Sequence, residues 1–200
     1  MQVALTVDIE EHGAPAGADN PRRQLEVFSR EGVPANFFVQ GRWAAAYPAL
    51  TRRIHADGHL IGNHTYHHAP LTMMTDEGIS YTVNRADEVI TPRAGIATTK
   101  PWFRCPYGDG EDDERVLGVL AGLGYRNVPW HVDPDDWRPD RTAEEVVEAV
   151  VIGCRERGDA LTIVLMHSWP DVTLGALPLF IEDLRAEGAT FVRLDQAGWP

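Results

Sequence analysis

The chain has 200 residues, of which 30 are acidic and 18 are basic, so its formal net charge is −12, and 44% of its residues are apolar. This length suits a single domain, which we place at residues 1–200. The acidic balance excludes broad binding to nucleic acid or to anionic membranes, because both depend on a basic surface. No run of about 18 apolar residues predicts a transmembrane helix. A neutral or cationic partner fits this charge better.

The first eight residues, MQVALTVD, lack the basic start and the apolar stretch of a signal peptide. We therefore expect a cytoplasmic protein, or a secreted one if a leader has been removed. The two cysteines, Cys105 and Cys154, are too few for a disulfide framework. We expect both to be reduced and structural.

Short apolar runs alternate with longer amphipathic segments, and Gly and Pro separate them. In chain order we expect a strand at 3–9, a helix at 20–31, a strand at 35–40, a helix at 44–56, a strand at 59–62, a helix at 76–90, a strand at 102–104, a helix at 111–123, a strand at 127–132, a helix from the cap at 142 to 157, a strand at 160–166, a helix at 177–187 and a strand at 190–194. The alternation predicts parallel strands with helical crossovers, in a barrel or a doubly wound sheet. About seven strands are slightly too few for an eightfold barrel, so we favour a distorted, incomplete barrel.

Polar side chains follow several of these strands, where functional groups of parallel α/β folds collect. They are Asp8, Glu10, Glu11 and His12, then His64, His67 and His68, then Arg104, Tyr107 and Asp109, then Asp133, Asp135, Asp136 and Trp137, and finally His167. His64 and His68 are four residues apart, which on a helical turn places both imidazoles on one face. Histidines with a carboxylate suit zinc, cobalt or a similar divalent ion. The alternative for this segment is a solvated polar turn.

Three further residues each allow two interpretations. His167 is either a hydrogen-bonded core histidine or a general acid oriented by the acidic residues near Trp137. Arg104 is either part of an ordinary buried ion pair or the group that keeps a catalytic carboxylate ionised and aligned. Tyr107 either packs or gives a backbone N–H to an oxyanion.

Six segments resemble, in order, the motifs of the polysaccharide deacetylase family, carbohydrate esterase family 4, whose domain is also called the NodB homology domain. They are residues 6–10 (TVDIE, similar to T-F-D-D-G), 35–39 (ANFFV, similar to A-T-F-F-V), 58–68 (GHLIGNHTYHH, similar to G-H-E-I-G-N-H-T and a second histidine), 103–108 (FRCPYG, similar to F-R-x-P-Y-G), 133–137 (DPDDW, similar to D-x-x-D-W) and 165–167 (LMH, similar to L-x-H). The resemblance spans nearly the whole chain. It implies a distorted, incomplete (β/α)7 barrel, in agreement with the expected elements.

The resemblance also implies roles for individual residues. Asp8 is the expected general base, oriented by Arg104, and His64 and His68 are expected metal ligands on a turn braced by Thr65. His167 is the expected general acid, supported by Asp136. Tyr107 is expected to give its backbone N–H to the oxyanion and to contact the substrate, and Trp137 and Leu165 are expected to wall the substrate pocket.

The first motif departs from the family pattern, because Ile9 stands where the family has an Asp ligand. Some relatives read D-x-D or D-x-E, which makes Glu10 the first choice for the third ligand. Asp8 and Glu10 point to the same side only while the strand stays extended. If the strand ends early, Glu11 or His12 is the alternative.

These residues predict a deacetylase that uses one divalent ion, zinc in the first place and otherwise cobalt, nickel or manganese, to hydrolyse the N-acetyl group of an acetamido sugar, such as a chitooligosaccharide or a peptidoglycan-type saccharide. The alternatives are hydrolysis of another amide such as a cyclic imide or ureide, O-acetyl xylan esterase activity, and a sugar-binding protein without catalysis. The expected partner is a saccharide or a small-molecule amide.

Overall fold

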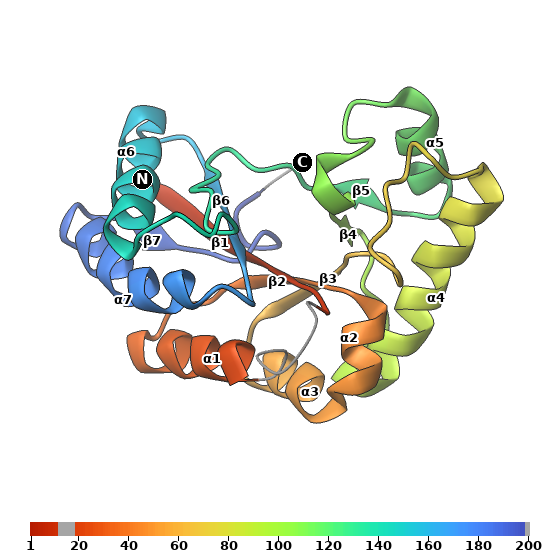
Figure 1. Cartoon of the computed structure of the whole chain (residues 1–200), viewed down its shortest axis with the longest axis horizontal. Coiled ribbons are helices and arrows are strands. Elements are labelled where there is room, and N and C mark those ends of the chain that lie inside the picture. The colour runs from red at the N-terminus through yellow and green to blue at the C-terminus, as the bar shows by residue number, and fades with distance from the viewer. Residues whose placement is uncertain (12–18, 199–200) are drawn as a thin grey trace.

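The computed structural model describes residues 1–11 and 19–198, and within them one parallel sheet of seven strands has helices around its outside (Figure 1). The strands are β1 (Gln2–Ile9), β2 (Asn36–Val39), β3 (Leu60–Asn63), β4 (Trp102–Phe103), β5 (Arg126–Asn127), β6 (Thr162–His167) and β7 (Thr190–Phe191). Their order is β5-β4-β3-β2-β1-β6, and β7 pairs with β1. The expected incomplete barrel is confirmed.

Helices connect these strands. They are α1 (Asp19–Glu31), α2 (Gly41–Ala46), α3 (Pro48–Ala56), α4 (Asp76–Ala94), α5 (Glu114–Gly122), α6 (Ala143–Arg157) and α7 (Asp171–Ala186), with a 3₁₀ turn, η1 (Pro106–Gly108). The cap expected at 142 is present at the start of α6, where Thr142 and Glu145 form a capping box. In the described part of the chain, each helix is too short or too polar to cross a membrane.

The strand β1 is the centre of the sheet, because seven of its eight residues are buried and it pairs with β2, β6 and β7. The pairing with β6 sets Asp8 directly opposite His167. The carboxyl ends of β1, β2, β3 and β6 therefore meet at one edge, as parallel pairing requires.

A single short segment joins the two outer edges of the sheet. It begins at β5, where the Val128 N–H donates to the Phe103 carbonyl at 2.7 Å. It ends beside β6, where the His131 N–H donates to the Ile163 carbonyl at 2.8 Å and Val132 pairs with Val164. The strand expected at 127–132 is therefore divided: its start pairs with β4 and its end with β6.

Four expected helices have other bounds, and one of them, expected at 76–90, continues to Ala94. The helix expected at 44–56 is two helices, because the residue before Pro48 avoids helical geometry and Pro48 instead begins α3. The helix expected at 111–123 begins later, since the Asp113 side chain caps α5 by accepting from two backbone N–H groups. The helix expected at 177–187 begins six residues earlier, at Asp171, and continues through Pro178.

Candidate active site

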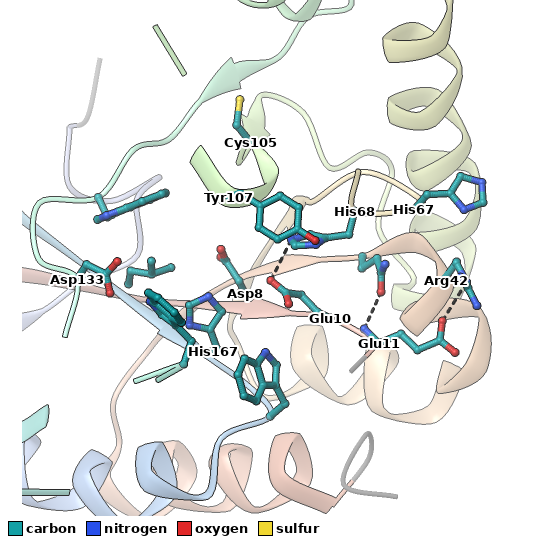
Figure 2. Close-up of a pocket in the computed structure, with 15 residues that line it drawn as sticks. Asp8, Glu10, Glu11, Arg42, His67, His68, Cys105, Tyr107, Asp133 and His167 are labelled. Carbon is teal, nitrogen blue, oxygen red and sulfur yellow. Dashed lines mark hydrogen bonds and ion pairs between the residues drawn. The ribbon is translucent and has the colours of Figure 1, made fainter. Parts of the chain in front are cut away.

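A cavity of about 680 Å³ opens at the carboxyl ends of the strands (Figure 2). Its lining includes Asp8, Glu10, His68, Tyr107 and His167, which come from segments far apart in the sequence. The carboxyl ends of β1 and β6 and the loops after β1, β3 and β4 bring them together, as the sequence predicts.

Three side chains gather closely enough to share one ion: Glu10, His64 and His68. The Glu10 Oε1 atom lies 3.0 Å from His68 Nε2 and 3.5 Å from His64 Nε2. Burial favours a raised pKa for the Glu10 carboxyl, but its contacts with the two histidines outweigh this and lower its pKa well below the usual range. Glu10 is therefore ionised.

The orientation of the His64 ring suits a metal ligand. Its Nδ1 lies 2.9 Å from the Arg104 carbonyl oxygen, which can only accept, so Nδ1 carries the proton. Its Nε2 is buried and has no hydrogen-bond partner among the described residues. A buried imidazole nitrogen that faces a carboxylate and a second imidazole fits a divalent ion of the zinc type.

The choice between the acidic residues at the end of β1 follows from their side-chain contacts. Asp8 lies within β1 and Glu10 lies one residue after its end, and both side chains line the cavity. Glu11 also lines the cavity but forms an ion pair with Arg42, between Oε2 and Nε at 2.9 Å, and its backbone N–H donates to Gln40 (Figure 2). His12 lies outside the described residues. Glu10 is thus the acidic residue that the structure sets beside both histidines.

Asp8 is held by a buried cation. Its Oδ1 accepts from Arg104 Nη1 at 2.9 Å, and its Oδ2 lies 3.6 Å from His64 Nε2. The Arg104 guanidinium also donates to Thr6 Oγ1 at 2.7 Å and to the Val128 carbonyl at 3.0 Å. These contacts fix one face of the Asp8 carboxylate and leave the other toward the cavity.

His167 forms a second buried pair, with Asp136. The distance from His167 Nδ1 to Asp136 Oδ1 is 2.7 Å, and the His167 backbone N–H donates to Oδ2 at 2.8 Å. Burial favours a lowered pKa for His167, but the hydrogen bond and charge of Asp136, with the charges of Asp8 and Glu10, raise the pKa to about 9. His167 therefore holds a proton at neutral pH, as a general acid must.

The loops around the cavity contain strained backbone. Among the described residues, the four non-glycine residues with positive φ are Thr65, His68, Tyr107 and Asp135, with φ between 57° and 60°. Such strain persists where the surrounding structure enforces it, and it is frequent at functional sites. Thr65 braces the histidine turn, since its Oγ1 accepts from the His68 N–H at 2.9 Å.

The expected wall residues line the cavity. Tyr107, Trp137 and Leu165 all contribute to it, and the Tyr107 ring, although 70% exposed, packs 4.4 Å from the His68 ring between centroids. Sequence reasoning did not single out the lining residues Trp130 and Trp169. Trp130 lies in the expected strand that leads to Asp133, and Trp169 lies two residues after His167, so their position was the available signal.

A carboxylate and a protonated histidine that flank an ion site at this edge of a parallel barrel are the groups of a hydrolase that activates water. Residues 1–128 match the sequence profile of the family described as polysaccharide deacetylase. The chain belongs to this family.

Individual relatives agree with this. A chitooligosaccharide deacetylase of Azorhizobium caulinodans is 31% identical over 177 residues, which cover 82% of this chain and 80% of that protein. A family 4 carbohydrate esterase from Streptomyces lividans, solved in complex with acetate, has a TM-score of 0.82 and 29% identity, with 95% of this chain and 91% of that chain covered. A family 4 acetyl xylan esterase from Clostridium thermocellum, solved with a cobalt ion, has a TM-score of 0.84 and 29% identity, covering 98% and 90%.

Proposed function

We propose that this protein is a divalent-metal-dependent deacetylase that hydrolyses the N-acetyl group of an acetamido sugar. The observation that carries the proposal is the cavity at which the cluster of Glu10, His64 and His68 lies beside both Asp8 and His167. We further propose that residues 1–200 form one catalytic domain, since β6 and β7 pair with β1 of the same sheet.

Glu10, His64 and His68 would hold the ion. When bound, a divalent ion of this type polarises the acetyl carbonyl and lowers the pKa of water. Zinc is our first choice, because nitrogen and carboxylate ligands suit it, and the cobalt in the acetyl xylan esterase supports a borderline divalent ion.

The residues of the chain account for the proton transfers. Asp8 accepts a proton from water as the water oxygen attacks the acetyl carbon, and the hydrogen bond from Arg104 keeps the carboxylate aligned. The Tyr107 backbone N–H donates to the carbonyl oxygen as negative charge develops there. His167 then gives the proton on Nε2 to the departing nitrogen as the C–N bond breaks, and acetate and a free amine result.

The aromatic walls support a sugar as substrate. Trp137, Trp130 and Tyr107 line the cavity, and flat aromatic rings offer the apolar surface that the C–H face of a sugar ring requires. The chitooligosaccharide deacetylase supports an N-acetyl group, whereas the xylan esterase keeps an O-acetyl group as the second candidate.

Acetate release tests the proposal. The zinc-loaded protein is incubated with N-acetylglucosamine oligomers, with acetylated xylan and with a cyclic imide. We expect acetate from the first substrate; turnover of the imide alone, or sugar binding without metal uptake or acetate, would refute the proposal. We expect Asp8→Asn to keep the ion and lose turnover, and His64→Ala to lose the ion.

A further inference from the structure

The carboxylate of Asp136, which orients the general acid, is itself held by a third residue. Asp136 and Thr173 are both buried, and Thr173 Oγ1 donates to Asp136 Oδ2 at 2.7 Å. The same Oδ2 accepts the His167 backbone N–H, and Oδ1 faces His167 Nδ1. Three hydrogen bonds thus compensate the burial of this charge, as a buried carboxylate requires.

The bond from Thr173 differs from the other two in its origin. Both of the others come from His167, so they fix Asp136 relative to that residue alone. Thr173 lies in the first turn of α7, which packs against α6 and α1. Its hydroxyl therefore ties the Asp136 and His167 pair to a separate, packed element of the fold.

The side-chain type and the position both favour this role. Threonine is branched at Cβ and has few χ1 rotamers, so its hydroxyl is held in place at a small entropic cost. The first turn of a helix carries partial positive charge, which favours a carboxylate nearby.

We propose that Thr173 is a positioning residue of the deacetylation reaction, one that fixes the Asp136 carboxylate so that the acidic proton of His167 stays directed into the cavity. This inference rests on the proposed function of His167 as the general acid. Loss of the hydroxyl removes one of the two hydrogen bonds that Asp136 Oδ2 accepts. The Asp136 carboxylate can then rotate away from His167 Nδ1. The chemical step suffers and substrate binding does not, because Thr173 is buried behind the acid pair.

Two substitutions distinguish the contribution of the Thr173 hydroxyl from that of its methyl group. Thr173→Val keeps the shape and removes the hydroxyl, and Thr173→Ser keeps the hydroxyl and removes the methyl. We expect Thr173→Val to lower kcat about tenfold with KM unchanged, as losses of such supporting bonds do, and Thr173→Ser to restore most of kcat. Thr51→Val is the matched control, since Thr51 is also buried in a helix but bonds the Tyr47 carbonyl away from the cavity.

An equal loss of kcat in Thr173→Val and Thr173→Ser, or no loss in Thr173→Val, would overturn the proposal. If Thr173→Val does not fold, Thr173→Ala and Thr173→Ser give the same comparison, because they differ only by the hydroxyl. Crystal structures of these variants test the role without turnover: a second Asp136 rotamer is expected only where the hydroxyl is missing, and a single rotamer in every variant contradicts it. Absence of acetate release by the wild type would refute the proposed function and leave this structural comparison valid.

Discussion

Replacement of Arg104 by leucine should destabilise the fold strongly, because it leaves the buried Asp8 carboxylate without its cation. Arg104 is 0% exposed and Asp8 only 4% exposed, and their atoms lie 2.9 Å apart. Removal of one partner of a buried ion pair costs about 3–5 kcal/mol of unfolding free energy. Arg185→Leu is the control: Arg185 pairs with Glu31 at the surface, where such a loss costs about 1 kcal/mol or less.

The assay is urea unfolding followed by tryptophan fluorescence, with a chelator present so that no ion contributes. The double variant Asp8→Asn/Arg104→Leu should be more stable than Arg104→Leu alone, since it leaves no unpaired charge, and the two changes should be coupled by about 1–3 kcal/mol. A loss in Arg104→Leu no larger than in Arg185→Leu, or additive effects in the double variant, would refute the account of this pair.

Three more predictions concern the ion, the pH and the substrate. Glu10→Gln should weaken zinc binding at least about tenfold by calorimetry, while Glu11→Gln should leave it within about twofold; the reverse order would contradict the ligand choice. Burial lowers the pKa of His59 from 6.5 to about 4. The neutral buried imidazole therefore contributes its full stability above pH 6.5, and the free energy of unfolding falls by about 3 kcal/mol at most as the pH falls toward 4. His59→Asn should flatten this part of the pH–stability curve, and the exposed control His55→Gln should not. Trp137→Ala should raise KM for an N-acetylglucosamine oligomer about tenfold with a smaller change in kcat; an unchanged KM would remove Trp137 from the sugar site.

The sequence was sufficient to predict where the functional groups lie. Strand ends are marked by the change from apolar to polar residues, and parallel pairing carries those ends to one edge. Asp8, His64, Arg104 and His167 therefore converge in the structure as their positions predict. The helix break before Pro48 was also readable, because a residue before proline avoids helical geometry, but the apolar periodicity across it favoured a single helix.

Other features depend on contacts that no local pattern encodes. Glu10 and Glu11 are chemically alike and adjacent, and only the positions of His68 and Arg42 separate their roles. The contact of Thr173 with Asp136 joins residues 37 positions apart. It depends on how α7 packs, and the helix expected at 177–187 did not include Thr173, so the sequence pattern offered no sign of it.

The central claim is that one divalent ion binds at Glu10, His64 and His68, next to Asp8 and His167. Anomalous scattering from crystals of the zinc-loaded protein tests it most directly. We predict one strong peak in the cavity, about 2.0–2.2 Å from a Glu10 oxygen and from Nε2 of each histidine. A peak coordinated by Glu11 or Asp133 instead, or no peak in the cavity, would contradict the account.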